Sequence, residues 1–389
     1  MKKLPLITKI LICLVIGISI GVGCRTTGFI WPVEWLVTFR NLFSAFLSFV
    51  IPLIIIGLII PGIASLGHQS GKSLLITTIL AYASTITAGM LAFMVGQQVL
   101  PMFIGSVGLL SENEVVVSPL FTIEIPALMS VMSALVFAFL LGIGLSSKKE
   151  GTLLKMCHEF SDIMMSLISR VIVPLVPFYI GAVFAELSYS GEVFQTIKSF
   201  LMVYLVLFSL QLIYIVILYL VAGGVKKRHP LALLQNMLPA YLTAAGTQSS
   251  AATIPVTLEC AKANDVDEEV CEFVIPLSAT IHLAGDTMTL VLTSMAILFM
   301  NGQTPTFALY VPFILMLGIT MIAAPGVPGG GVMAALGLLE SMLGFGSIEK
   351  PLMIALHAAQ DSFGTATNVT GDGAMAIFVE KIVKRKERA

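Results

Sequence analysis

The sequence predicts an all-α protein that crosses a membrane several times. Hydrophobic residues make up 57% of its 389 residues and charged residues only 11%. The mean hydropathy is +0.99, whereas about 25% of the residues in a soluble domain are charged. Apolar runs of about 20 residues, the length that crosses a hydrocarbon core, recur from Ile7 onward. We expect about eight membrane spans.

The first six spans follow one another with short connections, so no soluble domain fits between them. We place them at residues 5–24, 40–62, 74–99, 119–146, 162–188 and 197–223. Their Gly and Pro residues are compatible with spanning helices, because neighbouring helices satisfy the freed backbone groups.

Basic residues gather in alternate connections, which predicts an orientation by the positive-inside rule. The basic segments contain Lys2, Lys3 and Lys9, then Lys148, Lys149 and Lys155, then Lys226, Lys227 and Arg228, and finally Lys381, Lys384, Arg385, Lys386 and Arg388. The segment 111–117 contains Glu112 and Glu114 but no Lys or Arg. We therefore expect both termini in the cytoplasm and the protein in the plasma (inner) membrane.

After Lys227 the apolar segments become short, and small or polar residues interrupt two of them. Residues 246–255 read GTQSSAATIP, and residues 324–331 read APGVPGGG. Non-helical backbone is tolerated at membrane depth only inside protein or beside a watery cavity. Paired interruptions of this kind are typical of inverted-repeat transporters, whose site lies between the breaks. Alternatively, either stretch is an aqueous loop between two short spans.

The last span carries a stripe of polar side chains. Asp361, Thr365, Asn368 and Asp372 are spaced four, three and four residues apart, and His357 precedes them by four. This spacing puts them on one helical face. A carboxylate at the bilayer centre costs about 2.5–3.5 kcal/mol, so two of them require cationic partners. The alternatives are hydrogen bonds between helices, or a position at the membrane interface.

Three segments together resemble the dicarboxylate/amino acid:cation symporter family, which includes the glutamate transporters. They are DSFGTATNVTGD at 361–372, the Ser-rich stretch 247–255, and GVPG at 326–329. The resemblance implies eight transmembrane helices plus two re-entrant helical hairpins, assembled as a homotrimer with an elevator mechanism. It also implies that residues 1–230 are mainly scaffold, with spans three and six in the moving core, and that residues 231–389 form the transport core.

The resemblance assigns site residues. Asp361 would bind the substrate's amino group, Asn368 its α-carboxylate, and Thr365 would orient it. The two hairpins would close over the substrate. The substrate-binding positions are thus Gln248, Ser249, Ser250, Val327, Pro328, Gly329, Asp361, Gly364, Thr365 and Asn368. Sodium, if it is used, would be held by Asp372 with carbonyl oxygens near Ser278 and Asn368, because hard cations prefer oxygen ligands.

The chain differs from the family at the position that would bind an acidic side chain of the substrate. Glutamate and aspartate carriers place an arginine where this chain has Gly364, and some members have an arginine where this chain has Gln248. An arginine fork is the group that grips a carboxylate. We therefore expect a small, neutral amino acid as substrate. The alternative is a dicarboxylate or an acidic amino acid, carried with protons rather than sodium.

The seventh span departs further. Ala284 replaces an aspartate that helps to bind sodium in the family, and Met321 and Ala324 replace oxygen-bearing residues of the second hairpin. Loss of hard oxygen ligands weakens cation sites. Sodium stoichiometry therefore does not transfer from the family to this chain.

His282 and Asp286 stand one helical turn apart in the same span. A histidine titrates at about pH 6.5, so a His beside a carboxylate is a plausible proton carrier. The alternative is a neutral His hydrogen-bonded in the break and an Asp that caps the next helix. Ser84 and Thr85 offer hydroxyl oxygens to a cation or, alternatively, serve helix packing.

These observations predict a cation-coupled symporter, not an enzyme, with Na+ or H+ as coupling ion and no cofactor. Its partners would be a small amino acid, membrane lipid and two further copies of the chain. The sequence has no basic patch interleaved with aromatic residues outside the basic connections, so it does not predict nucleic-acid binding. The alternatives of another class are a channel, which would show carbonyl loops or rings of charge, and a sensor that binds substrate without transporting it.

Overall fold

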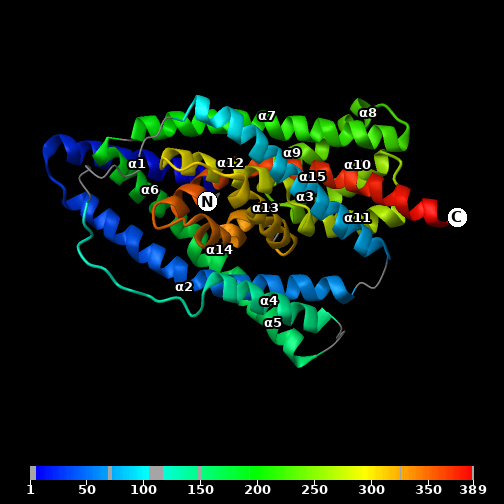
Figure 1. Ribbon diagram of the computed structural model, residues 1–389, viewed down its shortest axis with the longest axis horizontal. Coiled ribbons are helices and arrows are strands. Elements are labelled where there is room, and N and C mark those ends of the chain that lie inside the picture. Colours follow the sequence, from blue (N-terminus) through cyan, green and yellow to red (C-terminus); the bar gives the residue numbers. More distant parts are fainter. Residues whose placement is uncertain are drawn as a thin grey trace, which may run out of the picture.

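The computed structural model describes residues 6–68, 72–104, 117–146, 151–191, 193–324, 326 and 328–387, and the regular elements within these ranges are helices. The longest helices run along the long axis of the molecule (Figure 1). Among the described residues, six helical segments are long and apolar enough to cross a membrane, and shorter apolar helices accompany them. The all-helical membrane architecture is therefore confirmed.

One group of helices packs around the second span. It contains α1 (Leu6–Thr27), α2 (Trp31–His68), α4 (Val131–Ser146), α5 (Thr152–Leu167), a π-helical turn η2 (Ile168–Ile172) and α6 (Val173–Ser190). α1 lies along α6, whereas α2 contacts α4, α5 and α6. In Figure 1, α2, α4 and α5 form the lower side of the molecule.

A second group surrounds the last span. It contains α3 (Lys72–Val99) with the 3-10 turn η1 (Leu100–Met102), α7 (Val193–Lys226), α8 (Pro230–Asn236), α9 (Leu238–Thr247), α10 (Ser250–Ala263), α11 (Glu268–Ile281), α12 (Ala284–Met300) and α15 (Glu349–Glu387). α15 packs against α12, α9, α7 and α11, and α12 also packs against α3. The broken seventh span and the last span thus form the centre of this group.

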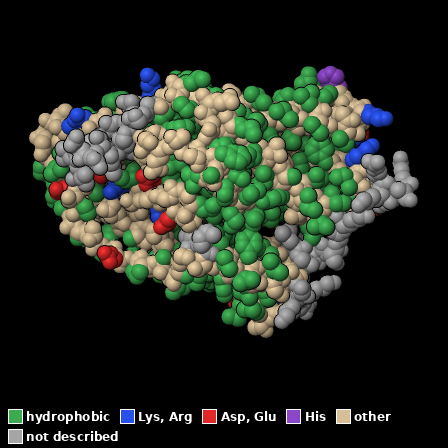
Figure 2. Space-filling view, viewed as in Figure 1, with side chains coloured by type: hydrophobic (Ala, Val, Ile, Leu, Met, Phe, Trp, Pro, Cys, Tyr) green, Lys and Arg blue, Asp and Glu red, His purple; other side chains and the backbone are tan. Residues whose placement is uncertain are grey.

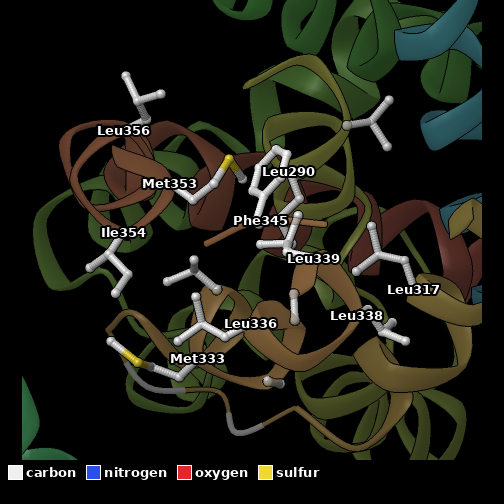
Figure 3. Packing of buried hydrophobic residues seen from close by; sticks show 14 of the residues in the cluster. Leu290, Leu317, Met333, Leu336, Leu338, Leu339, Phe345, Met353, Ile354 and Leu356 are labelled. Atoms are coloured by element: carbon white, nitrogen blue, oxygen red, sulfur yellow. The ribbon is translucent and has the colours of Figure 1, made fainter. Parts of the chain in front are cut away.

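Two short helices, α13 (Phe307–Ile322) and α14 (Gly330–Leu343), connect the two groups. α13 packs against α3, and α14 contacts α2, α4 and α15. Figure 3 shows apolar side chains of α12, α13, α14 and α15 meeting in one core, among them Leu290, Leu317, Leu336 and Met353. Each of these four is fully or almost fully buried.

The outer helices expose large apolar side chains. Examples are Leu11 and Val15 on α1, Leu140 on α4, and Leu201 and Leu220 on α7, each more than half exposed. Figure 2 shows such side chains spread over much of the visible surface, whereas Lys and Arg lie mainly toward the two ends of the molecule. A surface of this kind suits contact with lipid.

The predicted span at 119–146 is wrong in its first half. The helix starts only at Val131, and residues 117–130 contain no regular helix. Pro119 and Pro126 lie in this stretch, and proline removes a backbone donor and disfavours helix at the residue before it. The other predicted spans coincide with helices that extend further at one or both ends.

Parts of the predicted charge pattern lie outside the described residues, namely Lys2, Lys3, Glu112, Glu114, Lys148, Lys149 and Arg388. Two basic clusters lie at one end of the molecule, because Lys226 on α7 pairs with Glu380 on α15 at 2.5 Å. The connection after α7 and the C-terminal end of α15 therefore share one side (Figure 1).

Both interrupted segments form helical hairpins with non-helical tips. In the first, Gln248 adopts a left-handed backbone with φ 54° and ends α9, and the side chain of Ser249 caps α10 by accepting from the N–H of Ala252 at 3.2 Å. In the second, Gly329 has φ +74° before α14 begins. Pro325 and Val327 lie outside the described residues.

Candidate functional site

The tips of both hairpins meet the middle of α15. The hydroxyl of Ser249 donates to the carbonyl oxygen of Gly326 at 2.8 Å, which joins one tip to the other. The N–H of Gly329 donates to Oδ2 of Asp361 at 2.8 Å. Broken helices therefore surround a carboxylate that the sequence predicts at membrane depth.

Asp361 is buried, with only 6% of its surface exposed. Its other oxygen, Oδ1, accepts from the hydroxyl of Thr365 one turn further along α15, at 3.1 Å. Within the described part of the chain, Asp361 forms no ion pair with a lysine or an arginine. A buried carboxylate without a cationic partner is costly, so this position suits a positively charged ligand.

A second buried carboxylate, Asp286 at the start of α12, lies close to the first. Nε2 of His357 lies 3.0 Å from its Oδ1, and Nδ2 of Asn368 donates to its Oδ2 at 3.1 Å. The amide oxygen of Asn368 accepts from the N–H of Gly285 at 2.7 Å. Asn368 therefore holds the beginning of α12 against α15, and both ends of its amide are engaged.

A third buried carboxylate, Asp372, lies on α15 about three helical turns beyond Asp361, toward the C-terminus. Its Oδ1 is 3.0 Å from Nδ1 of His282, whose Nε2 is 2.9 Å from the hydroxyl of Ser84. The hydroxyl of Tyr214 on α7 lies 2.5 Å from that of Ser84. This chain of contacts connects α15, the break before α12, α3 and α7.

The predicted pairing of His282 with Asp286 is not found. Each residue belongs to a different pair, His282 with Asp372 and Asp286 with His357. The reason is the break itself: α11 ends at Ile281, His282 has φ −114° and ψ 88°, and α12 starts only at Ala284. Spacing by one helical turn does not hold across such a break.

The position that carries arginine in acidic amino acid carriers faces the second carboxylate. A Cβ built on Gly364 would lie 3.3 Å from Oδ1 of Asp286 and 3.4 Å from Oε1 of Gln360. Gln248 instead donates to the hydroxyl of Ser362 at 3.0 Å. No arginine or lysine therefore comes from either position.

The remaining predicted residues lie near the tips or in the ion region. Ser250 is buried at the first position of α10, and Pro328 is half-buried in the second tip, while Val327 is outside the described residues. The hydroxyl of Ser278 and Oδ2 of Asp372 are buried without a hydrogen-bond partner in the described part of the chain. The same holds for the hydroxyl of Thr85.

These unpartnered oxygens suit a hard cation as cotransported substrate. The imidazole of His282 on the other oxygen of Asp372 does not, because Na+ prefers oxygen ligands. Ser278 and Asp372, both predicted at the sodium site, thus each keep an oxygen without a hydrogen-bond partner among the described residues, but a ring nitrogen contacts the other oxygen of Asp372.

A polar network that the sequence did not indicate lies behind Asp286. Nε2 of Gln360 donates to Oε1 of Gln211 at 2.7 Å, and the hydroxyl of Thr289 donates to Oε1 of Gln360 at 2.9 Å. Gln211 and Tyr214 both interrupt the apolar run of α7, three residues apart. That spacing on one face was the available signal.

Buried acids gathered at the breaks of membrane helices define a membrane transport protein. The model of the sodium:dicarboxylate symporter family matches residues 6–382, so the chain belongs to this family. It is a family of transporters and not of enzymes, and the chain is an integral multi-pass membrane protein. The predicted resemblance is confirmed.

Distant relatives of known function support the family assignment. Excitatory amino acid transporter 1 of Ambystoma tigrinum is 28% identical over 276 residues, 68% of this chain and 50% of the relative. Excitatory amino acid transporter 3 of Homo sapiens is 31% identical over 263 residues, 66% of this chain and 49% of the relative. The matched part of the chain spans about half the length of these relatives.

Proposed function

We propose that the protein is a cation-coupled symporter for a small, neutral amino acid. The observation that carries this proposal is the contact of Asp361 with the tip of the second hairpin, through the N–H of Gly329 at 2.8 Å. A substrate ammonium beside Asp361 would neutralise the buried carboxylate. Movement of the tip would then control access to it.

The surroundings of Gly364 support a substrate without a negative side chain. If the substrate's acidic side chain lay beside Gly364, it would approach Oδ1 of Asp286 and would meet no arginine. Repulsion between Asp286 and a substrate carboxylate in a site without water would disfavour an acidic substrate more strongly than the absence of an arginine alone.

The coupling ion in this proposal is Na+ or H+. The free oxygens of Ser278, Thr85 and Asp372 support sodium, whereas the two imidazole–carboxylate pairs support protons. These are the cations that the symport would move with the amino acid.

The mechanism we propose is an elevator in a homotrimer, with eight spans and two re-entrant hairpins. The separate packing of α1, α2, α4, α5 and α6 supports their role as scaffold, within residues 1–230. The packing of α3 and α7 onto α12 and α15 supports their place in the moving core with residues 231–389. The shared end of Lys226 and Glu380 agrees with cytoplasmic termini in the inner membrane.

Uptake into proteoliposomes tests the proposal. A symporter concentrates a radiolabelled neutral amino acid above the bath when a sodium or proton gradient is imposed, and collapse of the gradient that drives it abolishes accumulation. A channel only equilibrates the label, and a sensor moves none. Accumulation of glutamate or succinate, but of no neutral amino acid, would overturn the proposed substrate class.

A further inference from the structure

Two carboxylates, not one, lie close together where α12, α15 and the second hairpin meet. One oxygen of Asp286, one of Asp361 and a ring nitrogen of His357 all lie within 4.8 Å of one another. All three side chains are at least nine-tenths buried. Their backbone elements differ, so the fold itself brings the acids together.

Two neighbouring glycines leave Asp286 uncovered by side chains on their sides of the carboxylate. A Cβ on Gly331, in the first turn of α14, would lie 3.1 Å from Oδ2 of Asp286. A Cβ on Gly364 would lie 3.3 Å from its Oδ1. Any larger residue at either position would cover Asp286.

The distance between the acids fits a primary ammonium group. A tetrahedral nitrogen that donates two hydrogen bonds of about 2.8 Å holds its acceptors about 4.6 Å apart. The oxygens of Asp286 and Asp361 lie no more than 4.8 Å apart. Each accepts one bond from the protein, and a carboxylate oxygen has lone pairs for a second.

We propose that Asp286 and Asp361 form a clamp that holds the substrate's primary ammonium between two carboxylates. This inference rests on the proposed amino acid function and deepens it, because it adds Asp286 as a substrate-binding residue. His357 acts as a positioning residue, since its Nε2 fixes Oδ1 of Asp286. The clamp requires at least two N–H donors on the substrate nitrogen.

N-methylation tests this requirement. The purified protein would be titrated with L-alanine, N-methyl-L-alanine and N,N-dimethyl-L-alanine, and binding read from thermal stabilisation. The dimethyl compound keeps one N–H donor, so it cannot bridge two acids. We expect it to bind at least about 30-fold more weakly than L-alanine, whereas the monomethyl compound keeps most of the affinity.

The variant Asp286→Asn tests the residue, with Asp265→Asn as control. Asp265 lies in an exposed ion pair with Arg228, so its loss should leave binding unchanged. We expect Asp286→Asn to weaken L-alanine binding at least about 10-fold and to reduce discrimination against the dimethyl compound to about 3-fold or less. Should Asp286→Asn not fold, the methylation series on the unaltered protein still decides.

Other outcomes would overturn the clamp. Equal binding of L-alanine and its dimethyl form by the unaltered protein would do so, as would an Asp286→Asn variant with unchanged affinity and discrimination. Stabilisation by Zn2+ alone that depends on Asp286, without any by amines, would assign the cluster to a metal instead. If succinate binds and no amine does, the proposed substrate class fails and the clamp with it.

Discussion

Nδ1 of His282 lies 3.0 Å from Oδ1 of Asp372, which joins the break before α12 to the C-terminal half of α15 through a buried imidazole–carboxylate pair. Each side chain is at most 1% exposed. The other ring nitrogen meets the hydroxyl of Ser84 on α3. An imidazolium in this place would neutralise Asp372 without a metal ion, which would be the physical basis of the proton coupling proposed above.

Replacing His282 by Asn should remove the imidazole that contacts Asp372. We expect His282→Asn to lower initial uptake at least about 10-fold and to abolish its dependence on an imposed proton gradient, because an asparagine amide does not take up a proton as an imidazole does. The measurement is uptake into proteoliposomes with pH and sodium gradients varied separately.

The exposed His229 provides a matched control, and uptake by His229→Asn should not change. An unchanged proton dependence in His282→Asn would show that the imidazole has only a structural role.

The left-handed backbone of Gly329 makes the second tip sensitive to substitution. Gly329 has φ +74°, and its N–H reaches Asp361. An L-residue in this conformation costs about 1–2 kcal/mol, so Gly329→Ala should shift the tip and weaken substrate binding about 10-fold or more. Isothermal titration with the transported amino acid measures the loss.

Gly302 provides the control for backbone strain. Its φ is +71° in the connection after α12, and a Cβ there meets no atom within 4 Å. Gly302→Ala should therefore lower thermal stability to a similar degree but leave affinity unchanged. Equal affinities for both variants would contradict a role of the second tip in binding.

Ser249 both caps α10 and connects the two hairpin tips. Ser249→Ala should lose about 1 kcal/mol of cap stabilisation and, in addition, the bond to Gly326. Thr306 caps α13 in the same way, by accepting from the N–H of Leu309 at 3.3 Å, far along the chain from the tips. Thr306→Ala should cost the cap alone.

We expect substrate protection of the tips from proteolysis to fall in Ser249→Ala and to persist in Thr306→Ala. The readout is the rate of cleavage at a protease site introduced in the second hairpin, with and without substrate. Identical protection in both variants would mean that the contact between Ser249 and Gly326 does not hold the tips together.

The periodic parts of the fold were predictable from sequence, whereas the contacts across breaks were not. Asp361 and Asp372 follow from helical spacing, because α15 is continuous through both. The partners of these acids come from residues 282 and 329, where the backbone leaves the helix. Local periodicity carries no information about direction after such a break, so His282 was assigned to the wrong carboxylate.

The polar network of Gln211, Thr289 and Gln360 shows a second limit. Gln211 interrupts the apolar run of α7, but its own helix does not indicate its partners, because only the packing of α7, α12 and α15 brings the three residues together. Hydrogen bonds between separate helices depend on tertiary packing, which one sequence does not specify residue by residue. The prolines at 119 and 126, by contrast, were a visible signal against a full-length fourth span.

Close contact between α1 and α6 depends on glycine at the crossing. A Cβ on Gly17 would overlap the carbonyl oxygen of Gly181, and a Cβ on Gly181 would lie 2.8 Å from the carbonyl oxygen of Cys13. Small residues at such crossings let helix backbones approach in a membrane. Gly17→Ala should therefore destabilise the protein by about 1–3 kcal/mol. Thermal unfolding of the purified protein in detergent measures this loss.

Gly23→Ala on the same helix, where a Cβ meets nothing within 4 Å, should be neutral or slightly stabilising because alanine favours helix more than glycine does. Equal melting temperatures for the two variants would show that α1 and α6 do not pack this closely in solution.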